Sequence, residues 1–317
     1  IFYILKLFVF FIFSIQLRRL PIKSIRFPIR PDPLRINKIT IDKSHTMSLT
    51  KKTVVITGSS RGIGREIAIK CAQSGANIVI IGKTSDPHPK LEGTIHSVAK
   101  EVEDIGGQAL PIALDLRDDE QYPNVIKQIL DRFGDIHALV NNASALFMAK
   151  LQDTPIKKYD LVNGVNGRAT FLFTQACLPH LLKHRVSDVI TISPPLNLST
   201  KEFGKCPAYT ISKYNMSMVT LALSQAHKGD GLRANSLWPK TTVATAAVKH
   251  MLPKPVYMAS RHARIMGDAA YEILTHHDRN HTGNFYLDDD VLINAGVTNL
   301  VQYKRNRLLP TVPDLFL

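Results

Sequence analysis

The residues best placed for chemistry are Tyr209 and Lys213, four positions apart near the start of a predicted helix. Four residues make about one helical turn, so the phenol and the ammonium group lie on one face. A cation beside a Tyr hydroxyl favours the phenolate and lowers a pKa that is usually ~10. The pair is suited to proton transfer, although the same spacing also occurs in helices without catalytic roles. The elements around the pair decide between these interpretations.

Apolar strands alternate with helices from residue 53 onward. The expected strands are residues 53–57, 77–81, 109–114, 136–140, 189–192, 232–238 and 284–287. The expected helices are residues 65–74, 91–105, 118–133, 155–182, 209–226 and 261–274. This alternation is typical of an α/β fold, here a single domain with a doubly wound parallel sheet of about seven strands. Ligands of such folds bind at the carboxyl ends of the strands.

A glycine-rich segment directly follows the first expected strand and opens the next helix. Gly58, Gly62 and Gly64 stand at a spacing that suits a dinucleotide-binding loop. Glycines let the backbone turn tightly and approach a pyrophosphate, while the helix N-terminus presents N–H groups to its charge. We therefore predict a dinucleotide site at this turn.

These motifs resemble, in their order, those of the short-chain dehydrogenase/reductase family over about residues 50–290. The glycine segment is similar to the family's cofactor loop, and Asn141-Asn142-Ala143-Ser144 resembles its Asn-Asn-Ala-Gly motif after the fourth strand. Four residues fall in the order of the family's catalytic tetrad, namely Asn166, Ser193, Tyr209 and Lys213. The resemblance implies a Rossmann-type fold and an NAD(P)-dependent oxidoreductase.

The resemblance also implies a role for each residue of this tetrad. Tyr209 would protonate the substrate carbonyl oxygen as hydride arrives, or remove the proton in the reverse direction. Lys213 would lower the pKa of Tyr209 and bind the nicotinamide ribose. Ser193 would hold the substrate oxygen, and Asn166 would support a water that leads from Lys213 to solvent.

Two residues depart from the family pattern. Ser144 replaces a Gly near the expected nicotinamide position, and Lys240 replaces the Gly that usually follows the Pro after the sixth strand. In addition, Pro194 and Pro195 follow the predicted catalytic serine and stiffen one wall of the substrate cleft.

The expected cofactor is NADP, with NAD as the alternative. NAD enzymes of this fold usually carry Asp or Glu after the second strand, whereas this chain has Gly82-Lys83-Thr84. Lys83 and Arg61 could pair with a 2′-phosphate. The expected cofactor-binding residues are Thr57, Gly58, Ser60, Arg61, Gly62, Ile63, Gly64, Lys83, Asp115, Asn142, Tyr209, Lys213 and Pro239. Within this set, Asp115 resembles the family's adenine-contacting Asp.

A narrower set of motifs resembles a subgroup of the family whose members continue into a sterol-carrier-like lipid domain. The motifs include Ile192-Ser193-Pro194-Pro195, Trp238-Pro239-Lys240-Thr241 and the final Pro313-Asp314-Leu315-Phe316-Leu317. This resemblance implies a lipid-like substrate, of fatty-acyl or steroid type, and a location in peroxisomes or mitochondria, with the cytoplasm as the alternative. The alternative function is that of a low-activity cofactor-binding scaffold in lipid metabolism.

Charge and composition argue against several other classes of protein. Residues 1–46 hold nine Lys or Arg against two Asp, a charge of +7 that is half of the net +14. The remaining charge is spread without long basic runs, so nucleic-acid binding is not expected. Three widely spaced cysteines fit a reduced intracellular compartment. His276, His277 and His281 lie in a polar stretch, which predicts a solvated loop rather than a metal site.

The chain divides into three expected parts. Residues 1–46 are predicted to be a disordered or non-native leader, because Met47 directly precedes the first strand. A signal anchor or an organellar leader is the alternative for the apolar residues 1–17, which are fewer than a spanning helix needs; a membrane-anchored reductase would depend on it. Residues 47–300 form the dehydrogenase domain, and residues 301–317 form a loosely packed tail.

Two long helices are the expected surface for self-association. Relatives in the family commonly pair through them, and here they are residues 155–182 and 209–226. We therefore expect a homo-oligomer that acts on a small molecule, without nucleic acid and without stable membrane insertion.

Overall fold

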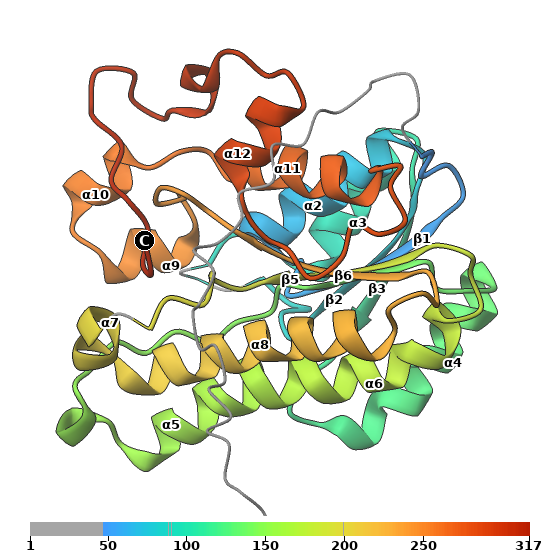
Figure 1. Cartoon of the computed structure of the whole chain (residues 1–317), viewed down its shortest axis with the longest axis horizontal. Coiled ribbons are helices and arrows are strands. Elements are labelled where there is room, and N and C mark those ends of the chain that lie inside the picture. Colours follow the sequence, from blue (N-terminus) through green and yellow to red (C-terminus); the bar gives the residue numbers. More distant parts are fainter. Residues whose placement is uncertain (1–46, 88, 90, 199) are drawn as a thin grey trace, which may run out of the picture. The chain divides into compact units, whose positions relative to one another are not determined.

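A parallel sheet of seven strands lies between two layers of helices in this computed structural model (Figure 1). The structure describes residues 47–87, 89, 91–198 and 200–317, and the expected leader at residues 1–46 lies outside the described residues. The strands are β1 (Thr53–Thr57), β2 (Asn77–Gly82), β3 (Gln108–Ala113), β4 (Ala138–Asn141), β5 (Ser187–Ile192), β6 (Leu232–Trp238) and β7 (Phe285–Leu287). Their order is β3-β2-β1-β4-β5-β6-β7, and each neighbouring pair is parallel. The predicted doubly wound fold is confirmed.

Burial of both sheet faces explains the continuous apolar runs of the strands. β1 reads Thr-Val-Val-Ile-Thr and is buried throughout, and β2 reads Asn-Ile-Val-Ile-Ile-Gly with only its first residue half-buried. β-Branched side chains suit such a pleated environment. The predicted bounds of β1 and β6 match the structure, and the ends of the other strands differ from the prediction by at most two residues.

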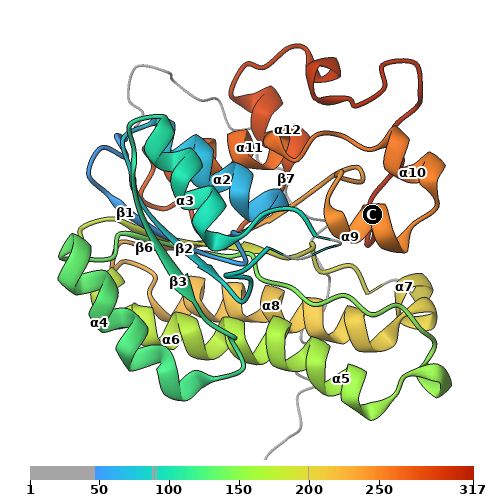
Figure 2. The ribbon, with the colours of Figure 1, turned by 180° about the vertical axis from the view of Figure 1, so that it is seen from behind.

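Helices cover both faces of the sheet, as Figures 1 and 2 show from opposite sides. One face carries α2 (Gly62–Gln73), α3 (Ile95–Asp104) and α11 (Arg264–Leu274). The other face carries α4 (Tyr122–Phe133), α6 (Ala169–Leu181) and α8 (Pro207–Ala226). Shorter elements are α5 (Ile156–Asn163), α7 (Thr200–Lys205), α9 (Ala246–Met251), α10 (Lys254–Ala259), α12 (Asp288–Asn294) and the 3-10 turns η2 (Asp119–Gln121), η3 (Leu151–Asp153) and η5 (Leu300–Tyr303). Buried apolar side chains fill both interfaces between helices and sheet.

The expected helix at residues 155–182 is interrupted, which corrects the prediction of one continuous helix. A π-helical segment, Gly164–Arg168, separates α5 from α6. A Cβ on Gly167 would lie 2.5 Å from Asn215 Nδ2, so the close packing against α8 requires glycine there. The wider turn carries Asn166, whose side chain is fully buried.

The segment at residues 301–317 packs against the domain, so the prediction of a loose tail is wrong. Phe316 is 3% exposed, and its ring lies 5.5 Å from the ring of Tyr214 and 5.7 Å from that of Trp238. The Trp238 indole N–H donates to the carbonyl oxygen of Leu315 at 3.0 Å. A single large aromatic side chain, Phe316, therefore anchors a segment whose composition predicts a solvent-exposed tail.

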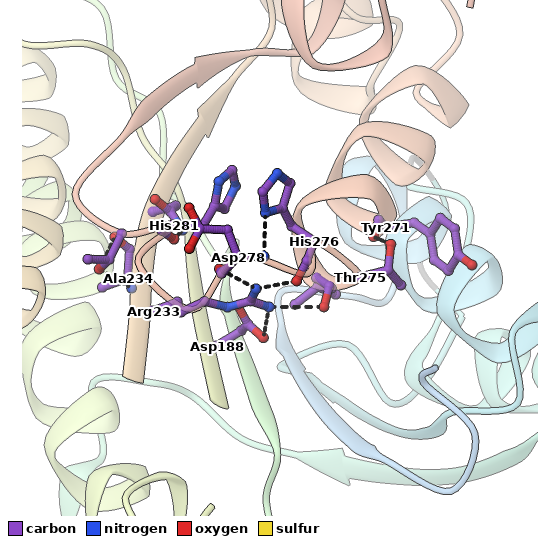
Figure 3. Close-up of polar contacts among 11 residues, drawn as sticks. Asp188, Arg233, Ala234, Tyr271, Thr275, His276, Asp278 and His281 are labelled. Atoms are coloured by element: carbon purple, nitrogen blue, oxygen red, sulfur yellow. Dashed lines mark hydrogen bonds and ion pairs between the residues drawn. The ribbon is translucent and has the colours of Figure 1, made fainter. Parts of the chain in front are cut away.

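A buried ion pair lies at the amino-terminal ends of β5 and β6, here called the amino edge of the sheet (Figure 3). Arg233 in β6 forms two 2.8 Å bonds with the carboxylate of Asp188 in β5. Its guanidinium group also donates to the main-chain oxygens of Leu274, at 3.2 Å, and of His276. The rings of His276 and His281 stack with centroids 3.7 Å apart and are buried. The prediction of a solvated loop is therefore wrong for these two histidines, because the arginine holds the loop against the sheet.

Candidate active site

The glycine loop and the loop after β4 meet where the strand order reverses, between β1 and β4. Such a reversal opens a ligand-binding crevice at the carboxyl ends of the strands. Thr57 Oγ1 accepts hydrogen bonds from the main-chain N–H groups of Asn142 at 3.0 Å and Ala143 at 3.1 Å. Asn142 Nδ2 donates in return to the carbonyl oxygens of Thr57 at 2.8 Å and Gly58 at 3.0 Å. These bonds fix the two loops against each other.

Two glycines are required by this close approach. Gly58 has a φ of +66°, and a Cβ there would lie 2.7 Å from Ala143 Cα. A Cβ on Gly64 would lie 2.5 Å from Asn142 Nδ2. A side chain at either position would push the loops apart and crowd the backbone that approaches a pyrophosphate. The residues present thus fit a dinucleotide.

A cavity of about 590 Å³ begins at this loop and holds most of the expected cofactor-binding residues. Its lining includes Gly58, Ser60, Arg61, Gly62, Ile63, Lys83, Asp115 and Asn142. Three other expected residues line an adjoining cavity of about 380 Å³, namely Tyr209, Lys213 and Pro239. Ile63, Asn142 and Ser144 border both cavities. The structure therefore gathers eleven of the thirteen expected residues around two neighbouring spaces at the carboxyl ends of the strands, and Thr57 and Gly64 line neither cavity.

The charged residues of the larger cavity contact one another and the main chain. Lys83 Nζ pairs with Asp115 Oδ2 at 2.9 Å, and Arg117 Nε donates to Asp115 Oδ1 at 3.0 Å. These hydrogen bonds, the one from Arg117 above all, hold the pKa of Asp115 well below its usual range. Arg61 donates to the carbonyl oxygen of Gly93 at 2.8 Å. The side chain of Lys83 is 71% exposed, which leaves it free to reorient toward a phosphate.

The smaller cavity is largely apolar, and Tyr209 and Lys213 give it one polar end. Its apolar walls include Leu146, Met148, Val248, Leu252, Val256, Val312 and Leu315. Both polar residues come from α8, lie on the same side of the helix as their spacing predicts, and are buried against the sheet.

Lys213 is a buried cation with no carboxylate at ion-pair distance within the described residues. Its Nζ donates to the carbonyl oxygen of Ile192 at 2.9 Å and approaches Met216 Sδ at 3.5 Å. The ammonium group also lies 5.3 Å from the centroid of the Trp238 ring. Burial lowers the pKa of Lys213 to about 7, and the charge of Asp314 opposes that shift.

Tyr209 holds its proton firmly. Burial raises the pKa of its hydroxyl, the negative charge of Asp314 raises it further, and the nearby Ser144 side chain lowers it. The net shift is upward, opposite to the lowering by Lys213 that the sequence suggests. Because the group is a phenol at neutral pH, it is in the form that can donate a proton to a carbonyl oxygen.

Asp314 is a site residue that the sequence reasoning missed. It lines the smaller cavity, and its N–H donates to the carbonyl oxygen of Lys240 at 3.2 Å. Burial raises the pKa of Asp314 to about 6, against the opposing effects of a main-chain hydrogen bond and the charge of Lys213. An acid two residues before Phe316, in an otherwise apolar ending, is the signal that could have revealed it.

Ser193 is placed differently from what the family pattern implies. Its side chain is fully buried, its Oγ bonds to Ser236 Oγ of β6, and it does not line either cavity. Side chains alternate between the two faces along an extended segment. A serine that stands one position earlier or later along such a segment therefore points its hydroxyl away from the crevice. The placement does not fit the predicted contact with a substrate oxygen.

Asn166 links the loop after β4 to the helix that carries Tyr209. Its Oδ1 accepts from Ala145 N at 2.7 Å, and its Nδ2 donates to Ala145 O at 3.0 Å and to Ser212 Oγ at 2.9 Å. Ser212 Oγ donates in turn to the carbonyl oxygen of Tyr209 at 2.8 Å. Asn166 is thus a fixed part of the site, and its predicted support of a water remains a prediction.

Lys240, the unusual residue after Pro239, has a structural explanation. Its N–H donates to Asp288 Oδ1 at 2.8 Å, and its Nζ pairs with Asp290 Oδ1 at 3.1 Å. These contacts fix the segment after β6 to the start of α12. The side chain therefore points to an ion pair, and the cavity at this point is lined by Pro239 instead.

Two negative findings concern the described residues alone. In residues 47–317 without 88, 90 and 199, no helix is both long and apolar enough to span a membrane. Within the same part of the chain, no cluster of three or more His, Cys, Asp or Glu side chains is arranged to hold a metal ion.

A glycine loop at the reversal point of a doubly wound sheet, beside a buried Tyr and Lys, is the arrangement of a dinucleotide-dependent oxidoreductase. Residues 52–263 match the family model of the short chain dehydrogenases. The chain belongs to this family, and the family match together with the dehydrogenase-like neighbours supports NAD(P)-dependent oxidoreductase chemistry.

Comparison with individual proteins shows which members of the family this chain resembles. Hydroxysteroid dehydrogenase-like protein 2 of Homo sapiens is 44% identical over 273 residues, which cover 86% of this chain and 65% of that protein. The same values hold for the Danio rerio protein, which confirms the subgroup suggested by the narrower motifs. The crystal structure of a protein described as a putative dehydrogenase from Xanthomonas campestris superposes with a TM-score of 0.83 at 43% identity, covering 86% of this chain and 99% of that one. A structure described as a putative NAD(P)-dependent gluconate 5-dehydrogenase from Beutenbergia cavernae, with NADP bound at low occupancy, gives a TM-score of 0.66 at 26% identity, covering 78% of this chain and 98% of that one.

Proposed function

We propose that this chain is an NADP-dependent oxidoreductase that interconverts a carbonyl and an alcohol on a lipid-like substrate. The observation that carries the proposal is the position of Tyr209 and Lys213. Both are buried at the polar end of an apolar cavity, which adjoins the cavity that starts at the glycine loop. A substrate carbonyl in the smaller cavity would therefore lie between the proton donor and the nicotinamide.

Proton transfer in this site is the task of Tyr209. The bound nicotinamide supplies or accepts the hydride at the substrate carbon. As the carbonyl carbon gains hydride, its oxygen takes the Tyr209 proton, and an alcohol and a phenolate result. Lys213, one turn further along α8, would stabilise the phenolate by its charge. In the oxidation of an alcohol, the same groups would work in reverse.

The NADP preference is supported by the charges at the end of β2. Lys83 follows this strand directly and lines the larger cavity, and its side chain is 71% exposed, so it could leave Asp115 for a 2′-phosphate. Arg61 lines the same cavity, although its guanidinium group currently contacts main-chain oxygens. A charge-assisted hydrogen bond contributes about 1.5–3 kcal/mol, so each contact would favour NADPH over NADH by about tenfold or more.

Removal of Lys83 tests this preference. Lys83→Ala should weaken NADPH binding by about tenfold and leave NADH binding nearly unchanged. Lys127→Ala is a matched control, because Lys127 is also 71% exposed and also pairs with a carboxylate, but on α4. Fluorescence titration of both cofactors measures the constants. A wild-type protein that binds NADH more tightly than NADPH would overturn the preference.

The lipid-like substrate is supported by the apolar walls of the smaller cavity and by the related hydroxysteroid dehydrogenase-like proteins. Long hydrocarbon chains or fused rings would bury apolar area against these walls. A panel of decanal, acetophenone, acetoacetyl-CoA and a ketosteroid, each with NADPH, tests the class by consumption of the cofactor. We expect turnover with at least one apolar carbonyl compound. Absence of turnover across the panel would favour the alternative of a cofactor-binding scaffold.

Self-association through the helical face is the remaining partner proposal. Phe171 of α6 and Met218 of α8 are 54% and 56% exposed, and Ile156 of α5 is 70% exposed. Exposed apolar side chains on neighbouring helices suit an interface with a second copy. Sedimentation of the wild type against a Phe171→Lys, Met218→Lys variant tests this, and a monomeric wild type would contradict it.

The resemblance also supports a peroxisomal or mitochondrial location as part of the proposal. The three cysteines are buried and unpaired, as expected for a reducing compartment. Imaging of the native full-length protein with organelle markers tests the location, and exclusive staining of the cell exterior or the cytoplasm would contradict it.

A further inference from the structure

The reaction requires a group that holds the substrate oxygen beside the Tyr209 hydroxyl. The family pattern gives this task to a serine, and Ser193 is the residue that it selects. In this structure Ser193 Oγ is fully buried and bonded to Ser236 Oγ, outside the lining of both cavities. Freeing its hydroxyl would leave Ser236 without that buried partner, which costs about 1–3 kcal/mol.

Ser144 is a hydroxyl in the right place. It borders both the larger and the smaller cavity, so it lies where the cofactor space meets the substrate space. Its side chain is exposed to these spaces and lies close enough to Tyr209 to lower the pKa of that hydroxyl. The other contact of its Oγ is a weak one, to the carbonyl oxygen of Ala145 at 3.4 Å. The hydroxyl is therefore available to a third group in the cavity.

The main chain next to Ser144 is held rigidly. Asn166 bonds to both the N–H and the carbonyl oxygen of Ala145, at 2.7 Å and 3.0 Å. Asn142 bonds to the carbonyl oxygens of Thr57 and Gly58 on the other side. A hydroxyl on a loop that is fixed at both flanks is preorganised, which is what stabilisation of a reacting oxygen requires.

We propose that Ser144, rather than Ser193, supplies the second hydroxyl that orients the substrate oxygen next to Tyr209. This inference rests on the proposed function. Ser144 stands where the family has glycine, so the chain has the hydroxyl on the loop after β4 instead of on the segment after β5. During reduction, Ser144 donates a hydrogen bond to the carbonyl oxygen while Tyr209 transfers its proton to that oxygen. Ser193 then has a structural role, fixing the end of β5 to β6.

The test compares Ser144→Ala with Ser193→Ala, using the carbonyl compound from the panel that the wild type reduces best. Loss of a donor to a reacting oxygen should lower kcat by about 10- to 100-fold in Ser144→Ala, with NADPH binding unchanged. Ser144→Thr keeps the hydroxyl and should restore most of the rate. Ser193→Ala should change kcat by less than about threefold while lowering the melting temperature.

A pH profile separates a catalytic from a structural effect of Ser144. The Ser144 side chain lowers the pKa of Tyr209, so its removal raises that pKa. In alcohol oxidation, where Tyr209 must release its proton, the Ser144→Ala profile should move to higher pH. The other groups that act on the Tyr209 pKa are Asp314 and Cys206, and both stay in place in this variant.

The outcomes are distinct. A large loss in Ser193→Ala together with wild-type kcat in Ser144→Ala would overturn the inference and return the role to Ser193. Wild-type kcat in both variants, with an inactive Tyr209→Phe, would overturn the inference and leave the proposed function intact. A Tyr209→Phe variant as active as the wild type, or a wild type without turnover, would overturn the proposed function itself and the inference with it.

Discussion

The two ends of the sheet each contain a buried cation, and the two are held in different ways. Arg233, at the amino edge, is fully buried and bonds twice to Asp188 at 2.8 Å and also to main-chain oxygens (Figure 3). Lys213, at the carboxyl edge, is 2% exposed, and among the described residues its ammonium group contacts a carbonyl oxygen, a thioether and an indole ring. The charge of Arg233 is fully compensated by its partners, whereas that of Lys213 is not.

This difference separates structure from chemistry. A buried charge with a complete set of partners has fixed protonation and serves the fold. A buried charge with few partners, beside a cavity, has a shifted pKa and can change its protonation during a reaction. The pKa of Lys213 is lowered to about 7, within reach of physiological pH. The contrast predicts opposite outcomes when each cation is removed.

Removal of Lys213 should abolish turnover without loss of stability. We expect Lys213→Met to lower kcat by about 10²- to 10⁴-fold, the range for a group that assists proton transfer. Folding lowers the pKa of this lysine from 10.5 to about 7, so the folded state disfavours the charged form. The resulting loss of stability grows as the pH falls from 10.5 and is fully present below about pH 7. The stability of the variant should therefore equal or exceed that of the wild type at pH 7, as urea unfolding would measure. Retained turnover in Lys213→Met would contradict the contrast between a reactive Lys213 and a structural Arg233.

Removal of Arg233 should have the reverse effect. Arg233→Met leaves the Asp188 carboxylate buried without its partner, which should cost about 3–5 kcal/mol of unfolding free energy. Arg279→Met is the control, because Arg279 is an exposed arginine that donates to a main-chain oxygen near the same edge. Its loss should cost less than about 0.5 kcal/mol. Turnover per folded molecule should stay near wild type in both variants, and unchanged stability of Arg233→Met would contradict the assignment.

Asp314 gives a smaller test, based on pH. Its negative charge raises the pKa of Lys213 and that of Tyr209. Asp314→Asn should therefore lower both pKa values, and the decline of the reduction rate at high pH should begin at lower pH. Asp290→Asn, which alters the ion pair with Lys240 on the neighbouring segment, should leave the profile in place. A shift to higher pH in Asp314→Asn would contradict the geometry of the carboxyl edge.

The sequence was most informative where local pattern alone determines structure. β1 and β6 were predicted to the residue: β1 is a continuous run of β-branched residues that ends at a glycine, and β6 ends at a proline. The glycine loop and the spacing of Tyr209 and Lys213 also follow from local geometry. These features are enough to place the candidate site at the carboxyl ends of the strands.

Contacts between distant segments account for what the sequence did not reveal. The π-helical turn at residues 164–168 depends on the packing of Gly167 against Asn215 of α8. The burial of His276 depends on Arg233, more than forty positions earlier. The position of Asp314 depends on the docking of Phe316 among aromatic rings from α8 and β6. Ser193 shows a different limit, since residue order does not reveal which way a side chain turns at the end of a strand.

The most direct measurement of the central claim is turnover by Tyr209→Phe, which removes one oxygen atom and keeps the ring. We predict that kcat with the best carbonyl substrate falls by about 10³-fold or more, while the Kd for NADPH stays within about twofold of the wild-type value. The folded ring should still pack beside Phe316, so the melting temperature should change little. Wild-type turnover in Tyr209→Phe would contradict the assignment of Tyr209 as the proton donor.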